Sequence, residues 1–179
     1  MGVPMGVPVK VVVTGAGGML GRALVPALAA AGHEAVALTR EHADVTRLED
    51  LRRALRASRP DWVVHLAAFT RVDECESQAD HAHLVNGLGA RNAAQAAGEV
   101  GAAILVLSTD YVFPGDGARP YREHDPTGPR SVYGAAKLAD LLPTRGGADQ
   151  EAGLEVLHHV AGHRRRRAYD RADGDRQGL

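Results

Sequence analysis

Short apolar runs alternate with segments of helical periodicity through the first three quarters of the chain. Four runs predict β-strands, and they cover residues 9–14, 34–39, 61–67 and 102–108. The first run is apolar on both faces, which is typical of a central strand in a covered parallel sheet. Between the runs, the spacing of apolar residues predicts helices over 19–31, over 48–57 and within 77–98. Gly32 is expected to end the first helix, and Pro26 is expected to kink it or weaken one turn. This alternation predicts right-handed βαβ units and an α/β fold with a doubly wound parallel sheet of the Rossmann type.

The pattern changes after Leu142. Residues 143–179 hold a Gly-Gly pair, a His-His pair and four consecutive arginines, with no strand-like run, and only 151–160 suggests a helix. A doubly wound enzyme normally continues here with another strand. We therefore divide the chain into an N-terminal extension over 1–8, a Rossmann domain over 9–142 and an atypical tail over 143–179, either flexible or read out of frame.

Composition and charge exclude several classes of protein. The 179 residues are 45% hydrophobic and carry a formal net charge of −1, so nothing in the overall charge favours nucleic acid or an anionic membrane as a partner. No apolar run approaches the roughly 18 residues needed to span a bilayer. The first eight residues lack the features of a signal peptide. Cys75 is the single cysteine, which excludes an internal disulfide, and we expect a cytoplasmic protein.

A glycine cluster follows the first predicted strand and opens the first helix. Gly15, Gly18 and Gly21 allow a tight turn, a close approach of the backbone to a pyrophosphate, and close packing of helix on strand. The positive end of the helix would then face the anion. Because the βαβ rhythm surrounds this loop, we interpret the Rossmann domain as NAD(P)-binding. The alternative is a glycine-rich turn without a ligand.

The end of the second strand bears on the choice of cofactor. Arg40 stands where an arginine favours a 2′-phosphate, which makes NADP(H) the preferred cofactor and NAD(H) the alternative. The competing interpretation is a solvated surface arginine. Asp44 and Val45 follow, where a side chain can accept a bond from the adenine amino group. Asp44 could equally cap the next helix.

Tyr133 and Lys137 form a Y-x-x-x-K pair, which on a helix lies on one face. Reduction of a ketone delivers a hydride to carbon and a proton to oxygen, and a nearby ammonium lowers the pKa of a phenol enough for it to act as the acid. Ser108 and Thr109 end the fourth strand, where ligands of open α/β sheets bind. Thr109 can orient the substrate carbonyl. The alternatives are a packed tyrosine beside a solvated lysine, and a polar strand end.

The order of these blocks resembles the extended short-chain dehydrogenase/reductase superfamily, and most closely the dTDP-4-dehydrorhamnose reductase family. The resemblance rests on Val13-Thr-Gly-Ala-Gly-Gly-Met-Leu-Gly21, Ala67-Ala-Phe-Thr-Arg-Val-Asp-Glu-Cys-Glu76, Asn86, Ser108-Thr-Asp-Tyr-Val-Phe-Pro-Gly115 and Tyr133-Gly-Ala-Ala-Lys137. It covers about residues 9–140, roughly half of a typical member, so we expect the C-terminal substrate domain of the family to be missing from these 179 residues.

The resemblance implies roles for the matching residues. The implied catalytic triad is Thr109, Tyr133 and Lys137. Implied cofactor-binding residues are Gly15, Gly18, Met19, Leu20, Gly21, Asp44, Val45, Ala67, Ala68 and Thr70, and the arguments from the residues add Arg40, Tyr133 and Lys137. Implied substrate contacts are Val72 and Tyr111, and we expect Thr109 and Asp110 of the same strand end to contact the substrate as well. Some members hold a magnesium-linked dimer through a glutamate two residues after the last loop glycine; this chain has Ala23 there, so no metal is carried over, and a homodimer stays open.

Three functions are left open. The first is NADPH-dependent reduction of a 4-keto-6-deoxy nucleotide sugar, with this short chain expected to show weak or no turnover. The second is an NAD-dependent nucleotide-sugar epimerase or dehydratase, and the third is a non-catalytic cofactor-binding regulatory subunit.

For the remaining candidate residues we favour interpretations without a catalytic or binding role. Cys75 is expected to be an inert thiol, and Trp62 a core residue. The tail histidines, His158, His159 and His163, lack a carboxylate or cysteine partner for a metal, and Arg164–Arg167 is expected to be solvated.

Overall fold

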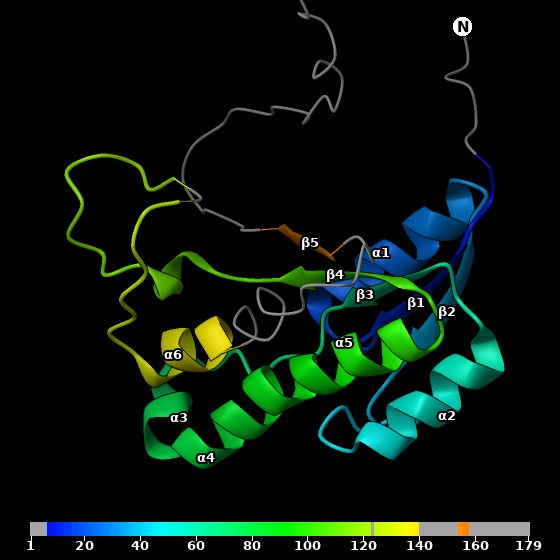
Figure 1. Ribbon diagram of the computed structural model, residues 1–179, viewed down its shortest axis with the longest axis horizontal. Helices are drawn as coiled ribbons and strands as arrows, with labels where there is room; N and C mark the ends of the chain where they lie inside the picture. Colours follow the sequence, from blue (N-terminus) through cyan, green and yellow to red (C-terminus); the bar gives the residue numbers. More distant parts are fainter. Residues whose placement is uncertain (1–6, 123, 140–153, 158–179) are drawn as a thin grey trace, which may run out of the picture.

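The computed structural model describes residues 7–122 and 124–139, together with the backbone of 154–157. Within these residues the strands form one parallel sheet in the order β2-β1-β3-β4-β5 (Figure 1). The strands are β1 (Lys10–Thr14), β2 (Glu34–Leu38), β3 (Trp62–His65), β4 (Ala103–Leu107) and β5 (Leu154–Leu157). Four of them match the four predicted runs. The predicted α/β fold with a parallel sheet is therefore confirmed.

Helical segments connect the strands. They are α1 (Met19–Ala30), α2 (Leu48–Ser58), α3 (Val72–Ser77), α4 (Ala79–Ala82), the π-helix η1 (His83–Leu88), α5 (Gly89–Glu99), the 3₁₀ helix η2 (Asp110–Val112) and α6 (Val132–Ala139). α1 continues through Pro26, and Gly32 follows its end with a φ of +85°. The helix expected within 77–98 is present as α4, η1 and α5, with a π-helical turn at its centre.

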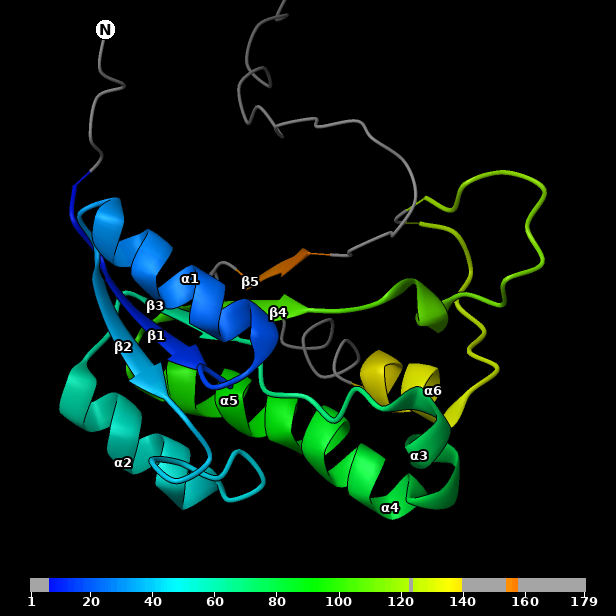
Figure 2. The same ribbon diagram turned by 180° about the vertical axis from the view of Figure 1, so that it is seen from behind.

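The central strand alternates its side chains between two apolar layers. Val11 and Val13 pack with Leu24 and Leu28 of α1, which covers one face. Val12 packs on the other face with α2 and α5, in a cluster that includes Leu51, Leu55, Val63, Ala93, Ala97 and Ile104. Figures 1 and 2 show α1 on one side of the sheet and α2 and α5 on the other, which makes the sheet doubly wound. Trp62 is half-buried against the α1 layer, as expected of a core residue.

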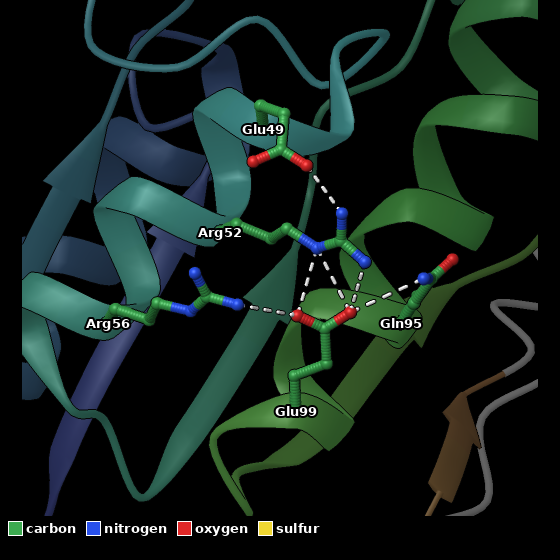
Figure 3. Close-up of polar contacts among 5 residues, drawn as sticks. All are labelled: Glu49, Arg52, Arg56, Gln95 and Glu99. Atoms are coloured by element: carbon green, nitrogen blue, oxygen red, sulfur yellow. Dashed lines mark hydrogen bonds and ion pairs between the residues drawn. The ribbon is translucent and has the colours of Figure 1, made fainter.

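α2 and α5 are joined at their outer surface by an ion network (Figure 3). Arg52 donates from Nε to the carboxylate of Glu99 at 2.9 and 3.0 Å and also pairs with Glu49. Arg56 lies 3.3 Å from the same carboxylate, and Gln95 donates to it at 3.3 Å. These side chains thus partner one another across the two helices.

Two short helices and one strand were not predicted. α3 and η2 hold six and three residues, which is too short for a helical period to be recognised. The helix suggested within 151–160 is wrong for 154–157, which form a strand parallel to β4, with Ile104 opposite Leu154. The physical reason is that β4 would otherwise expose an edge of unpaired backbone groups, and such an edge accepts a further strand. The other residues of the predicted tail, and residues 1–6 of the predicted extension, lie outside the described residues.

Candidate functional site

Two adjoining cavities lie beyond the carboxyl ends of β1 and β3. The larger has a volume of about 460 Å³ and the smaller about 260 Å³. They share five lining residues, namely Gly15, Gly18, Leu66, Ala67 and Ala68. In the sheet β2 lies on one side of β1 and β3 on the other, so the strand order reverses at β1. Ligands of open α/β sheets bind at such a reversal, and the two cavities lie there.

At two glycines the loop between β1 and α1 approaches its neighbours so closely that a side chain is excluded. Gly15 has a φ of +65°, and a Cβ there would lie 2.6 Å from the amide nitrogen of Ala67. A Cβ on Gly21 would lie 2.5 Å from the Cα of Ala16. Gly18, the N-cap of α1, supplies no side chain, and the first turn of α1 holds no acidic residue. The positive end of α1 is therefore left for an anion from outside the helix.

Arg40 and Asp44 line the larger cavity from the end of β2. The Arg40 side chain is 80% exposed, and its Nε lies 3.6 Å from Asp44 Oδ2. Asp44 accepts hydrogen bonds from Thr46, at 2.7 Å from its hydroxyl and at 3.0 Å from its amide. These bonds, and next the charge of Arg40, hold the pKa of Asp44 below its usual value against the opposing effect of burial. The alternative that Asp44 caps the next helix is wrong, because the N-cap of α2 is Arg47.

Val45 lines the same cavity and fixes the position of the neighbouring helix. A Cβ on Gly89 would lie 2.9 Å from Val45 Cγ2, so a larger residue in α5 would push this wall inward.

Tyr133 and Lys137 line the smaller cavity together. The other predicted residues in its wall are Gly15, Gly18, Met19, Leu20, Gly21, Ala67, Ala68 and Thr70. Lys137 is only 4% exposed, whereas Met19 is 93% exposed at the rim. The structure therefore brings the predicted phenol and ammonium to one wall and the glycine loop to the other.

His65 also lines the smaller cavity, although no role in the site was predicted for it from the sequence. Its Nδ1 lies 2.9 Å from the Thr14 hydroxyl, and its Nε2 is buried with no hydrogen-bond partner. Burial, and then the charge of Lys137, lowers its pKa to about 3. Ser108 Oγ lines the same cavity and is likewise buried without a partner. Two buried polar atoms in one wall, both unsatisfied, favour a polar ligand or water in that cavity.

The predicted substrate contacts lie next to these cavities rather than in their walls. Thr109 Oγ accepts a hydrogen bond from the Tyr111 amide at 3.3 Å and donates to Asp110 at 3.2 Å. The Tyr111 ring meets the Tyr133 ring edge to face at 5.7 Å between centroids. A Cβ on Gly134 would overlap the Tyr111 carbonyl oxygen, so this helix glycine lets α6 pack directly on η2. Val72 begins α3, which packs beside α6. Thr109 is therefore linked to Tyr133 through Tyr111, and it belongs to neither wall.

Asn86 holds the segment after β3, in which Leu66, Ala67 and Ala68 line both cavities. Its Oδ1 accepts from the Phe69 amide at 2.7 Å, and its Nδ2 donates to the Phe69 carbonyl at 2.9 Å. It is 1% exposed and lies within η1. Asn86 is one of the residues on which the family resemblance rests, but no role was predicted for it from the sequence.

Several features carry no ligand site. Burial, followed by the charges of Glu76 and Glu74, raises the pKa of the Cys75 thiol, in agreement with an inert cysteine. Among the described residues, no three His, Cys, Asp or Glu side chains gather as metal ligands. No helix in the described part of the chain is long and apolar enough to cross a membrane. The histidines and arginines of 158–167 lie outside the described residues.

The chain matches a known protein family and several solved structures. Residues 9–140 match the family described as RmlD substrate binding domain. A dTDP-4-dehydrorhamnose reductase of Streptomyces griseus is 52% identical over 145 residues, which cover 81% of this chain and 45% of that protein. The structure of a dTDP-4-dehydrorhamnose reductase of Bacillus anthracis in complex with NADP has a TM-score of 0.74 at 35% identity, covering 76% of this chain and 49% of that one.

A third relative comes from a different activity class. A Thermus thermophilus UDP-glucose 4-epimerase in complex with NAD has a TM-score of 0.68 at 29% identity, covering 83% of this chain and 53% of the other. The chain spans about half the length of the curated relatives it matches.

Proposed function

The chain belongs to the RmlD substrate binding domain family, and on that premise we propose that it is the cofactor-binding half of an NADPH-dependent reductase of a 4-keto-6-deoxy nucleotide sugar. One observation carries the proposal: two cavities adjoin at the glycine loop, which lines both, and one is lined by Arg40 and the other by Tyr133 and Lys137. That arrangement matches a dinucleotide, with a phosphorylated adenosine at one end and a reactive ring at the other.

The residues present fit NADP(H). A Cβ at Gly15 or Gly21 would meet the backbone of Ala67 or Ala16, so the loop needs these glycines for the tight turn and the close helix packing typical of a pyrophosphate-binding loop. Arg40 would bind the 2′-phosphate, and Asp44 and Val45 would face the adenine. Gly15 and Gly18 would shape the turn, in which the Gly18 amide donates to the Gly15 carbonyl at 2.9 Å. The pyrophosphate would be bound by the amides that open α1, those of Met19, Leu20 and Gly21, and the segment with Ala67, Ala68 and Thr70 would line the same cavity.

Residues of this chain would donate the proton that the reduction requires. NADPH, when bound, supplies a hydride to the carbonyl carbon of the sugar. Tyr133 would donate its phenolic proton to the carbonyl oxygen, and the ammonium of Lys137 would stabilise the phenolate left behind. The Thr109 hydroxyl would orient the carbonyl. Val72, Asp110 and Tyr111 would contact the sugar beside it.

The test is Tyr133→Phe in a protein extended to the length of its relatives, since this chain covers about half of them. We expect kcat to fall by about a hundredfold to ten-thousandfold, as loss of a general acid usually costs. The measurement is NADPH oxidation with a 4-keto-6-deoxy nucleotide sugar. An unchanged kcat would remove Tyr133 as the acid. The 179-residue chain alone should bind NADPH yet show weak or no turnover.

An NAD-dependent epimerase or dehydratase is the second candidate, favoured by the likeness to the Thermus thermophilus epimerase. Such an enzyme would restore its cofactor in each cycle. Protein that purifies with stoichiometric NAD and converts a nucleotide sugar without added reductant would support this candidate over the reductase.

A further inference from the structure

We propose that Glu76 is a positioning residue for α6, the helix that carries Tyr133 and Lys137. This inference rests on the proposed function, which gives Tyr133 and Lys137 their roles in the reaction. The carboxylate Oε1 of Glu76 accepts a hydrogen bond from the backbone amide of Val132 at 2.8 Å. Val132 is the first residue of α6 and stands directly before Tyr133.

The start of α6 is capped twice, once locally and once from a distance. The first amides of a helix have no partner within it, and an acidic or hydroxyl oxygen stabilises them. Ser131 Oγ accepts from the amide of Gly134 at 3.0 Å, which fixes where the helix begins. Glu76 reaches the amide of Val132 from 56 residues away, which fixes where that beginning lies relative to the rest of the site. A negative charge here also interacts favourably with the positive end of the helix.

The neighbour of Glu76 anchors α3 to α6. Cys75 is fully buried in an apolar cluster with Ala82 and Ala136, and Val132 and Tyr133 pack against that cluster. Its thiol donates to the Phe69 carbonyl at 3.7 Å. Apolar contact does not depend on direction, whereas a hydrogen bond does. The cluster therefore sets the separation of the two helices, and the carboxylate of Glu76 sets the position of α6 along its own axis.

A displacement of the start of α6 would be passed on to the reactive groups. Tyr133 is the next residue, and Lys137 follows one turn later on the same face. Both side chains line the smaller cavity, where a misplacement of about 1 Å is enough to cost a hundredfold in rate. The role of Glu76 is thus to hold these groups in register with the glycine loop across the cavity.

The first test uses hydrogen exchange of the full 179-residue chain without any ligand. We expect the amide of Val132 to be protected in the wild type. Glu76→Ala should remove that protection, whereas Glu76→Gln, which keeps an acceptor oxygen, should retain most of it. Asp73→Ala, which removes another exposed carboxylate of α3, should leave it unchanged. If Val132 exchanges in the wild type as fast as an unprotected amide, the inference is overturned, even if the variants fail to fold.

The second test measures NADPH affinity by fluorescence titration of the same four proteins. Glu76→Ala should raise the Kd by about fivefold, the factor expected from loss of a helix cap that holds a binding residue. Glu76→Gln should stay near the wild-type value, which separates loss of the acceptor from loss of charge. Equal affinity of Glu76→Ala and the wild type would overturn the inference. Failure of the wild type to bind NADPH would instead overturn the proposed function. The exchange result, which needs no ligand, would still test whether Glu76 holds the start of α6.

Discussion

The α2–α5 surface and the cavities at the strand ends both gather polar side chains, but the partners of those side chains differ. On the α2–α5 surface, Arg52, Arg56, Gln95 and Glu49 all converge on or around the carboxylate of Glu99 (Figure 3). In the smaller cavity, His65 Nε2 and Ser108 Oγ are buried and have no partner. Exposed charges that satisfy one another stabilise little, whereas buried atoms left unsatisfied are costly unless a ligand or water binds them. Of the two polar regions, the smaller cavity is therefore the one whose polar atoms are available to bind a ligand.

The largest expected effect comes from filling the glycine cradle. In Gly21→Ala the new Cβ would lie 2.5 Å from backbone, so the loop or α1 must shift. NADPH affinity should fall by about a hundredfold or more, which corresponds to about 3 kcal/mol. Gly17→Ala is the matched variant in the same loop, because its Cβ would meet only Thr39 Cγ2 at 3.7 Å. It should lose far less affinity by isothermal titration. Equal losses in the two variants would contradict the cradle.

Arg40→Ala should give the next largest effect, and only with one cofactor. The side chain lines the larger cavity and is mostly exposed. Loss of a charge-assisted contact to a 2′-phosphate should raise the Kd for NADPH by about tenfold. The Kd for NADH, which lacks that phosphate, should stay the same. A parallel loss for both cofactors would mean that Arg40 acts only on the fold of the loop.

His65 should make stability depend on pH. Its pKa is lowered from 6.5 to about 3 by burial and by Lys137, so below pH 6.5 the unfolded chain binds a proton that the folded chain does not. Above pH 6.5 this difference has no effect on the free energy of unfolding. As the pH falls from 6.5 toward 3, it lowers the free energy of unfolding by about 1.4 kcal/mol per pH unit. In His65→Asn the free energy of unfolding, measured in urea at successive pH values, should fall less steeply. Identical slopes would show that the fold does not lower the pKa of His65.

The smallest effect is expected from the ion network. The network lies at the surface, with Arg56 65% exposed and Glu99 still 28% exposed, so Glu99→Gln should lower the melting temperature only modestly. The loss should shrink as salt is added, because salt screens such pairs. NADPH affinity should not change, since the network lies apart from both cavities. A loss of cofactor binding in this variant would contradict the view that only the cavities, and not the α2–α5 surface, serve cofactor binding.

The parts of the fold and site that could be predicted are those set by local sequence. The glycine loop and the Tyr133–Lys137 pair depend on backbone freedom and on helical spacing, which a sequence displays directly. The roles of His65 and Glu76 depend on partners 51 and 56 residues away, and no pattern along the chain reveals such contacts. Asp44 was ambiguous because an aspartate before a helix can cap it or form a turn with Thr46, and only the structure decides between them.

The same reason explains the elements that were missed. α3 is too short to show a period, and β5 is defined by its pairing with β4 rather than by its own four residues.

The most direct measurement is titration of the folded 179-residue chain with NADPH and with NADH, followed by intrinsic fluorescence or calorimetry. The two cavities and the glycine loop predict saturable binding of one NADPH per chain, with NADPH bound more tightly than NADH. No saturable binding of either dinucleotide to folded protein would contradict the account.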